Sequence, residues 1–416
     1  MAKAFSAEAA VVGGGPAGLV AALSLAAAGI ETLLLAPPPP PPPDRRTTAL
    51  LGGSVDLLRE LDVWAALAAA AAPLKHLRLV DATQRLLRAP EVVFHSAELD
   101  LEAFGYNVEN MRLRAALLAA CRKTAHLRIV EAAVTALELD DRGATLKHPG
   151  GEARVQLVAA ADGRKSRCRA AAGIAMHASA LPQTAIALNL RHSRPHGDTS
   201  TEFHTESGPF TLVPLAGDRS SLVCVVAPDE AERLAALNDA ELGREVESRA
   251  HSILGKMEIE GARGVFPLTL ERAERLAARR VALVGEAGHV LPPIGAQGLN
   301  LGLRDAAALA ELAAAARHEG RDPGGETLLR DYDERRRDDV RSRALAIEVA
   351  NWSLMSDFLP VHAARGLGLH LAARVGFFRR ALMRQGLGSN EDTRAGPSRI
   401  TSARRAAESR GSSPRP

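Results

Sequence analysis

A short glycine-rich segment near the N-terminus has the residue types and spacing that could hold a pyrophosphate. It reads Gly13-Gly14-Gly15-Pro16-Ala17-Gly18. Gly13 permits a tight turn, Gly15 lets the backbone approach the phosphates, and Gly18 lets a following helix pack against a sheet. The N-terminus of that helix would offer free N–H groups and the positive end of its dipole. A glycine-rich turn without a ligand is the alternative interpretation.

Two further segments could complete a dinucleotide site. Asp162-Gly163-Arg164 follows an apolar run, and its backbone and guanidinium could bind an oxygen-rich ligand, although an Asp-Gly pair more often marks a hairpin turn. Glu286 follows a second buried run and a glycine, so we expect its carboxylate at the carboxyl end of a strand, where ligands bind in open α/β sheets. There it could accept hydrogen bonds from ligand hydroxyls.

The residues after Glu286 suit a flat, negatively polarised ring. The run Pro292 to Gly302 is rich in glycine, which allows close approach of the backbone, and it leads into a helix near Gly298. The N–H groups of that helix would face the N1–C2=O edge of a reduced flavin, which carries negative charge. His289 is either a catalytic base or a partner for the loop backbone, and the second interpretation is favoured. The three segments together therefore predict one FAD site.

The elements around the first segment provide the context that the motif requires. A strand over 9–12, a helix over 19–28 closed by Gly29, and a strand over 30–35 predict a βαβ unit. The second strand usually ends in an acid that binds the ribose, but this chain has Ala36 there. Pro37 to Pro43 predict a stiff polyproline II spur. Asp44, Arg45 or Arg46 could supply the missing contact beyond it.

The rest of the chain predicts an α/β fold, in which a Rossmann-like FAD-binding domain carries an inserted β-sheet substrate domain and a C-terminal helical segment. We expect helical structure over 48–67 and 111–125, and strands over 75–94 and 184–226. The expected parts are an FAD-binding domain over 1–75, 100–178 and 275–325, a substrate domain over 76–99 and 179–274, a helical region over 326–388, and a disordered tail over 389–416.

Composition narrows the class of protein. The chain has 416 residues and a net charge of +3, which is too small to indicate nucleic-acid binding. Its three cysteines have no metal-type spacing and its histidines form no ligand cluster, so we expect reduced thiols, a cytoplasmic protein and no metal site. We expect no signal peptide, and there is no uncharged run long enough to predict a transmembrane helix.

These motifs resemble a known family. The chain is similar to class A flavoprotein monooxygenases of the UbiH/UbiF type, the ring hydroxylases of ubiquinone biosynthesis, over most of residues 8–388. The resemblance rests on residues 12–25, 44–50, 104–110, 162–169, 208–215, 266–268 and 281–305, of which Pro292 to Gly302 is the most diagnostic run.

The resemblance implies an enzyme that uses FAD, NAD(P)H and O2 to hydroxylate a polyprenylated phenol. It also implies contact with other ubiquinone-biosynthesis proteins and a peripheral position at the inner face of the membrane. Its implied cofactor-binding residues are Gly13, Gly15, Pro16, Ala17, Gly18, Arg46, Asn110, Asp162, Gly163, Glu286, Pro293, Gly295, Gly298 and Leu299. It identifies no catalytic acid or base.

Three departures from the family pattern leave alternatives open. Ala36 replaces the expected acid, Met111 stands where many relatives have Arg, and Glu286 with Gly288 stands where Asp and Ala are usual. A non-catalytic FAD-binding component of a ubiquinone-assembly complex is one alternative, and another FAD-dependent oxidoreductase is a second. The segment Leu367 to Met383 mixes apolar residues and arginines, which suits either a membrane-surface helix or a core helix.

Overall fold

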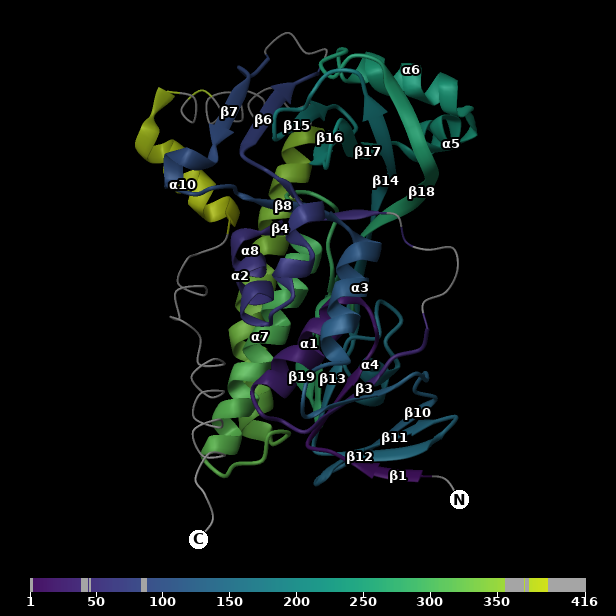
Figure 1. The fold of residues 1–416 in the computed structure, drawn as a ribbon, viewed down its shortest axis with the longest axis vertical. Coiled ribbons are helices and arrows are strands. Elements are labelled where there is room, and N and C mark those ends of the chain that lie inside the picture. The colour runs from purple at the N-terminus through teal and green to yellow at the C-terminus, as the bar shows by residue number, and fades with distance from the viewer. Residues whose placement is uncertain are drawn as a thin grey trace.

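The computed structural model describes residues 3–38, 44, 46–83, 88–355, 370 and 374–387. Most of the predicted polyproline spur and all of the predicted tail lie outside these residues. The molecule is elongated, with an α/β part at one end of its long axis and a large, mainly antiparallel sheet at the other (Figure 1).

The α/β part contains a six-stranded sheet in the order β19-β20-β13-β2-β3-β9. Its strands are β2 (Ala9–Val12), β3 (Thr32–Leu35), β9 (Leu127–Val130), β13 (Leu157–Ala160), β19 (Ala277–Ala278) and β20 (Val281–Leu283). All neighbouring pairs are parallel except β19 with β20. The four central strands, β20, β13, β2 and β3, are short and fully buried, which is typical of parallel strands that helices cover.

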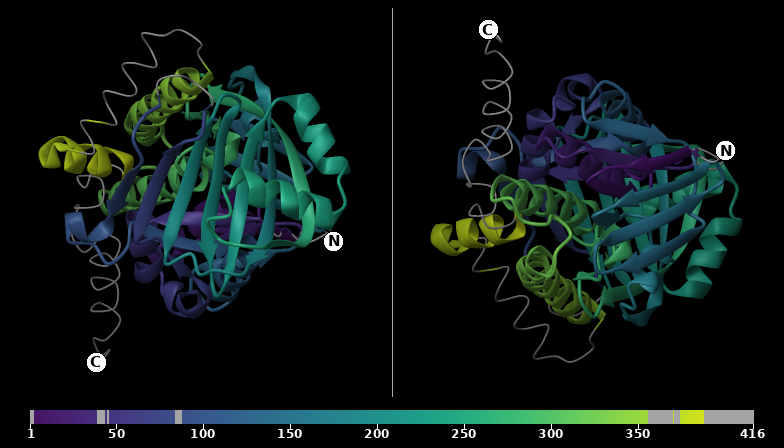
Figure 2. Two further views of the ribbon diagram at one scale, coloured as in Figure 1. Left: turned by 90° about the horizontal axis from the view of Figure 1, so that it is seen from above. Right: turned by 90° about the horizontal axis from the view of Figure 1, so that it is seen from below.

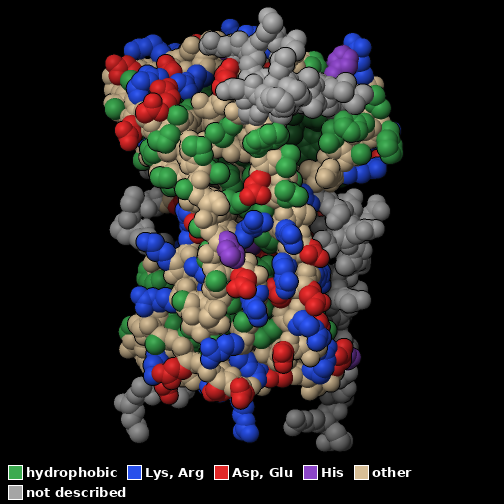
Figure 3. Space-filling view, turned by 180° about the vertical axis from the view of Figure 1, so that it is seen from behind, with side chains coloured by type: hydrophobic (Ala, Val, Ile, Leu, Met, Phe, Trp, Pro, Cys, Tyr) green, Lys and Arg blue, Asp and Glu red, His purple; other side chains and the backbone are tan. Residues whose placement is uncertain are grey.

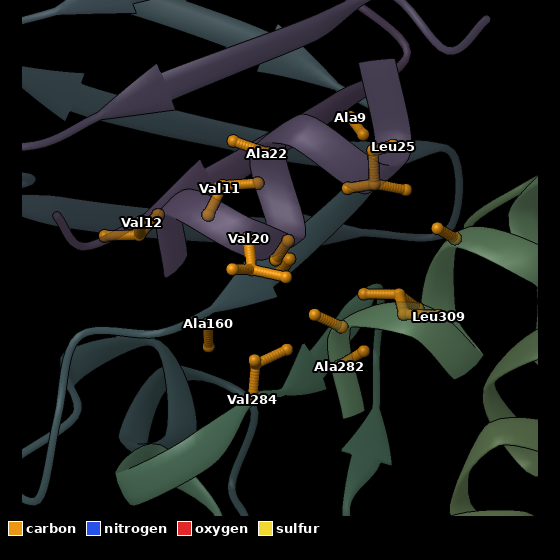
Figure 4. Close-up of a cluster of buried hydrophobic side chains, with 14 of the residues drawn as sticks. Ala9, Val11, Val12, Val20, Ala22, Leu25, Ala160, Ala282, Val284 and Leu309 are labelled. Atoms are coloured by element: carbon orange, nitrogen blue, oxygen red, sulfur yellow. The ribbon is translucent and has the colours of Figure 1, made fainter. Parts of the chain in front are cut away.

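Helix α1 (Pro16–Ala27) packs against this sheet, and α3 (Asn110–Cys121) and α7 (Gln297–His318) pack against α1. Figure 4 shows Val20 and Leu25 of α1 together with Leu309 of α7, Val11 and Ala282 in this core. Small aliphatic side chains fill the interior, which lets α1 and α7 approach closely. The predicted βαβ unit is confirmed, and Gly29 closes α1 in a left-handed conformation with φ +81°.

Two smaller sheets flank this core. A four-stranded sheet in the order β1-β12-β11-β10 consists of β1 (Lys3–Ser6), β10 (Ala136–Asp140), β11 (Gly143–His148) and β12 (Gly151–Val155). A three-stranded sheet, β4-β8-β5, consists of β4 (Thr47–Leu51), β5 (Ala72–Pro73) and β8 (Gly105–Glu109). The short helix α4 (Arg167–Ala171) follows β13.

The prediction of helix over 48–67 is partly wrong. Residues 47–51 form β4, which pairs antiparallel with β8, and helix α2 covers only Gly52–Glu60. Two 3-10 turns follow, η1 (Trp64–Ala66) and η2 (Ala68–Ala70). The β-branched Thr47 and Thr48 favour a strand. Pairing with β8, more than fifty residues later in the sequence, stabilises the strand over a helix.

The large sheet has eight strands in the order β21-β18-β14-β17-β16-β15-β6-β7. They are β6 (His76–Asp81), β7 (Val92–His95), β14 (Met176–His192), β15 (Thr199–Thr205), β16 (Gly208–Leu215), β17 (Arg219–Val226), β18 (Met257–Ala273) and β21 (His289–Val290). Helices α5 (Pro228–Ala236) and α6 (Asp239–Arg249) cover one face (Figure 2). The predicted inserted sheet is confirmed, whereas the residue bounds of the domains stay predictions.

Two helices follow α7 in the described part of the chain. The long helix α8 (Glu326–Met355) runs beside α7, and α10 (Gly376–Leu387) packs near β7 and the turn η3 (Ser96–Leu99). The predicted C-terminal helical segment is therefore confirmed. The segment 367–383 is described only at residue 370 and from residue 374 onward.

Candidate functional site: a dinucleotide cradle between two helix N-termini

The glycines of the first motif serve different purposes. Gly13 has φ +121°, and a Cβ atom there would lie 2.1 Å from the carbonyl oxygen of Ala161. A Cβ atom on Gly18 would lie 2.2 Å from the carbonyl oxygen of Gly13. Gly15, by contrast, is exposed and has no atom within 4 Å of an added Cβ. Gly13 and Gly18 are therefore required by the protein's own packing, whereas Gly15 opens onto space that a ligand could occupy.

The N-terminus of α1 is available to an anion. Gly15 occupies its N-cap position, no side chain caps it, and Pro16 is at the first helical position. Proline lacks an N–H, and its fixed φ suits the first turn. The open N–H groups of the first turn and the helix dipole form the kind of site that phosphates bind. Gly15 and Pro16 thus fit the predicted pyrophosphate cradle.

Ala17 lies where three segments pack together, and its predicted contact with the cofactor stays a prediction. A Cβ atom on Gly285 or on Gly302 would lie 3.2 Å from the Cβ of Ala17, so the starts of α1, of α7 and of the turn η4 (Gly285–Ala287) meet at one point. Any larger side chain at these three positions would push the segments apart. The first and third sequence motifs are therefore adjacent in space, as one shared ligand requires.

Arg114 also contacts this loop, and the sequence analysis missed it. Its Nε atom donates a hydrogen bond of 2.9 Å to the carbonyl oxygen of Gly14. It lies one helical turn after Asn110 on α3, but its partner Gly14 is 100 residues away in the sequence. Met111, where relatives have Arg, is 46% exposed. Ala36 is buried against Gly14 and offers no polar group to a ribose.

Arg46 and Asn110 come together around Asp44. The Asp44 carboxylate accepts hydrogen bonds from Arg46 Nε (2.8 Å) and Asn110 Nδ2 (2.9 Å), and Arg46 lies over the Phe266 ring at 5.1 Å. Burial would raise the pKa of Asp44, but the bonds from Arg46 and Asn110 lower it below its usual value. The pKa of Arg46 is raised, chiefly by Asp44 and to a lesser extent by Glu286. Asp44 therefore brings the predicted cofactor-binding residues Arg46 and Asn110 together, and their contact with FAD stays a prediction.

Asp162 shapes the second motif. Its carboxylate accepts hydrogen bonds from Ser166 Oγ (2.5 Å) and from the backbone N–H groups of Arg167 (2.8 Å) and Cys168 (3.2 Å), which start helix α4. β13 is a parallel strand followed by this helix, so the segment is not a hairpin turn. Gly163 has φ +80° and no atom within 4 Å of an added Cβ. The placement of Asp162 and Gly163 near the phosphates stays a prediction.

Glu286 is the one exposed residue between Val281 and His289. Within the part of the chain that the structure describes, its carboxylate makes neither a hydrogen bond nor an ion pair. Because it points outward, its extra methylene relative to Asp meets no packed neighbour. The glycine at position 288, where Ala is usual in the family, avoids a steric clash, since a Cβ there would lie 2.7 Å from Leu276 Cδ2. Glu286 is thus free to accept hydrogen bonds from a ligand.

A buried ionic cluster holds the loop that carries Glu286. Asp305 is fully buried and accepts hydrogen bonds from the Gly285 N–H (3.0 Å), His289 Nε2 (2.7 Å) and Arg336 Nε (2.7 Å). Tyr332 donates a bond of 2.6 Å to the carbonyl oxygen of Leu283 in β20. Burial would raise the pKa of Asp305, but the charges of His289 and Arg336 hold it below its usual range. His289 therefore bonds the Asp305 carboxylate, which in turn holds Gly285, and that it acts only in holding the loop stays a prediction.

The predicted ring loop leads into the second open helix N-terminus. Pro293, Gly295 and Gly298 are exposed, and Leu299 is half-buried. No side chain caps α7, and its N-cap residue Ala296 has φ +54°. This surface could receive a planar ring, with the helix N–H groups directed at its negative edge.

Asn300 ties this loop to the rest of the site. Its Nδ2 atom donates to the carbonyl oxygens of Ala49 (2.9 Å) and Ala296 (2.6 Å), and its Oδ1 atom accepts from Leu51 N–H (2.9 Å) and Ser54 Oγ (2.7 Å). All four partners lie in or beside β4, α2 and the loop. The site residue Asn300 lay inside the diagnostic run, but its partners could not be read from the sequence.

Comparison with known proteins decides the family. A family model described as an FAD-binding domain matches residues 6–345. The chain belongs to this family. The ubiquinone hydroxylase UbiL of Rhodospirillum rubrum is 38% identical over 338 residues, 80% of this chain and 77% of the relative. The 3-demethoxyubiquinol 3-hydroxylase of Escherichia coli is 33% identical, over 92% of this chain and 98% of the relative.

A solved structure shares the fold. The p-nitrophenol 4-monooxygenase PnpA of Pseudomonas putida superimposes with a TM-score of 0.74 at 21% identity, covering 92% of this chain and 98% of that one. The predicted resemblance is therefore confirmed, and the protein is an FAD-dependent monooxygenase. Among the described residues, no helix is both long and apolar enough to cross a bilayer.

Proposed function

We propose that this protein hydroxylates the aromatic ring of a polyprenylated phenol in ubiquinone biosynthesis, using FAD, NAD(P)H and O2. The observation that carries the proposal is the meeting of the first and third motifs at Ala17, Gly285 and Gly302, which joins two uncapped helix N-termini into one cradle. The names of the relatives, which are ubiquinone hydroxylases, supply the substrate class.

The chain's own residues would hold FAD along this cradle. The first turn of α1, beside Gly15, would bind the pyrophosphate, and Glu286 would accept hydrogen bonds from hydroxyl groups of the cofactor. Pro293, Gly295, Gly298 and Leu299 would line the ring, with the N–H groups at the start of α7 stabilising negative charge on it. Bound FAD, once reduced by NAD(P)H, supplies the activation of O2 and the transfer of one oxygen atom to the phenol.

The test separates this function from a non-catalytic FAD-binding role. The purified protein is expected to carry FAD noncovalently and to oxidise NAD(P)H faster when a phenolic substrate is added, with a hydroxylated product found by mass spectrometry. Bound FAD without any such stimulation or product would favour the non-catalytic alternative. Deleting the gene and identifying the accumulated quinone precursor by mass would define the ring position.

We also propose that α10 contacts a membrane surface with one of its two faces. Phe378 and Met383 pack against Phe94 in a small apolar cluster, and Arg379 forms an ion pair of 2.5 Å with Glu98. The opposite side exposes Phe377, which is 80% accessible. Arg374, Arg380 and Arg384 are exposed as well, and no acidic residue lies in α10. An apolar and basic face of this kind suits an anionic bilayer.

The two neighbouring phenylalanines of α10 provide a matched pair of variants. Phe377→Glu should abolish flotation with anionic liposomes and leave the melting temperature near that of the wild type. Phe378→Glu places a charge in the docked face and should lower the melting temperature. Unchanged flotation of Phe377→Glu would show that α10 is only a packing helix.

A further inference from the structure

A small apolar pocket lies beside the predicted ring loop, between the large sheet and α8. It has a volume of about 240 Å³. Its apolar lining includes Leu181 from the stretch of β14 where the register with β18 shifts, Leu270 from β18, Pro292 from the ring loop, and Ile347, Trp352 and Met355 from α8. Pro292 directly precedes Pro293, a predicted contact of the flavin ring, so the pocket begins one residue from the ring beside which the phenol must lie to be hydroxylated.

The amide groups in and behind this lining are already used within the protein. Asn351 Nδ2 donates a bond of 2.8 Å to Gln183 Oε1, and Gln183 Nε2 donates to the carbonyl oxygen of Ser207 at 2.6 Å. Gln183 and Asn351 are both buried. Glu348 is the one charged residue among those that line the pocket. The pocket therefore presents apolar surface with few groups that demand hydrogen bonds, which suits a hydrocarbon ligand.

The apolar surface continues from the pocket along the outside of α8. Leu345, Val349 and Trp352 are 58%, 55% and 58% exposed, and their spacing of four and three residues places them on one face of the helix. On the face of the molecule drawn in Figure 3, hydrophobic side chains gather around a hollow in the upper half, whereas charged side chains cover the lower half. Exposed apolar side chains grouped in this way mark binding surfaces.

We propose that this pocket and the α8 stripe, defined as Leu345, Val349 and Trp352, bind the isoprenoid tail of the substrate. The inference rests on the proposed function and adds a site to it. A phenol held beside the flavin ring would have its tail directed past Pro292 into the pocket, and a longer tail would continue over Trp352 along the stripe. Trp352 belongs to both the pocket and the stripe, so it is the residue on which the proposal depends most.

Trp352 also provides a direct binding assay that needs no catalysis. The chain has only two tryptophans, and Trp64 packs against Tyr106 with a centroid distance of 4.9 Å, away from the pocket-lining residues. In the Trp64→Phe variant, titration with farnesol should shift the emission of Trp352 to shorter wavelength in a saturable way, because the ligand removes water from the indole. The Trp352→Phe variant, which keeps Trp64, is the control and should show no shift.

Three outcomes of this titration would overturn the proposal. They are the absence of a saturable shift, equal affinity for a straight-chain alcohol with the same number of carbons, and an emission shift that follows protein concentration rather than farnesol. The second would show a nonselective apolar surface, and the third would show that another copy of the chain covers the stripe.

A kinetic experiment links the site to the reaction. The FAD-loaded enzyme is compared with two phenols that differ only in an isoprenoid substituent, and the KM of the tailless phenol is divided by that of the tailed one. Trp352→Glu should lower this ratio by at least about tenfold, the scale on which apolar pockets discriminate small apolar groups. Leu101→Glu, which introduces the same charge at another exposed apolar residue (41% exposed) that does not line the pocket, should leave the ratio unchanged.

The two experiments distinguish failure of the tail site from failure of the proposed function. If neither phenol stimulates NAD(P)H oxidation by the wild type but farnesol binds at Trp352, the hydroxylase function fails and the isoprenoid site stands. If both phenols are hydroxylated and Trp352→Glu leaves the KM ratio unchanged, the function stands and the tail site is wrong.

Discussion

The phosphate end and the ring end of the cradle obtain their shapes from different sources. At the phosphate end, consecutive residues from Gly13 to Gly18 turn the chain, and backbone contacts within the motif and with Ala161 fix the turn. At the ring end, the loop carrying Glu286 is held by Asp305 and Arg336, which come from two later helices. One end is therefore specified locally, whereas the other depends on tertiary structure, and substitutions should affect them differently.

The largest expected effect tests the dependence of the ring end on its buried cluster. Asp305→Ala removes the buried partner of Arg336 Nε, His289 Nε2 and the Gly285 N–H and leaves Arg336 paired only with Asp339, so the free energy of unfolding should fall by about 3–5 kcal/mol. Urea unfolding measures it. The matched control is Glu311→Ala, which removes a second ion pair between α7 and α8, that of Glu311 with Arg335 (2.7 Å). This pair is partly exposed, and its loss should cost less than about 1 kcal/mol.

The stability difference between wild type and Asp305→Ala should also depend on pH. The pKa of Asp305 lies below its ordinary value in the folded protein. Its contribution to stability is therefore fully present above the unfolded-state pKa of about 3.9 and is lost as the pH falls through the folded-state pKa. Below pH about 4 the difference in stability between wild type and Asp305→Ala should narrow. A difference that stays constant down to pH about 2 would contradict this role of the carboxylate.

The phosphate end should separate ligand binding from folding. Gly15→Val places its side chain in open space, so the melting temperature of the apoprotein should be unchanged while FAD affinity falls by at least about a hundredfold, or about 2.7 kcal/mol. Gly18→Val forces a side chain against the backbone of Gly13 and should impair folding itself. If the Gly15→Val variant keeps the flavin absorbance per protein of the wild type, the pyrophosphate does not bind at this loop.

This contrast also explains how far the sequence could predict the structure. The turn at Gly13, the βαβ unit and the open α7 start follow from short-range patterns, and the sequence predicted them. The strand β4 was predicted as helix because its pairing partner, β8, lies far along the chain. Asn300 and Arg114 were missed for the same reason, since the partners that give them a role, such as Ala49 and Gly14, are brought near only by folding.

Glu286 joins the two kinds of region, because a tertiary cluster holds its backbone but its side chain faces outward. Glu286→Ala should leave the melting temperature of the apoprotein nearly unchanged. Hydrogen bonds that involve a charged group are worth roughly 1.5–3 kcal/mol, so FAD affinity should fall about tenfold to a hundredfold. Glu286→Asp should be mild, since it keeps the carboxylate. Titration of the apoprotein with FAD measures both, and equal affinities of wild type and Glu286→Ala would exclude this role.

The smallest expected effect concerns Arg46, which lies between the two ends and is half exposed. Its ion pair with Asp44 has side-chain exposures of 51% and 40%, so solvent screens it, and its contact with the Phe266 ring is also near the surface. Arg46→Ala should therefore lower the free energy of unfolding by less than about 1 kcal/mol. Phe266→Leu removes only the ring contact and is the control for it. If Arg46 flanks FAD as predicted, Arg46→Ala should weaken FAD binding clearly more than Phe266→Leu does. If these two variants bind FAD with equal affinity, Arg46 does not contact FAD and serves only to link β4 with the large sheet.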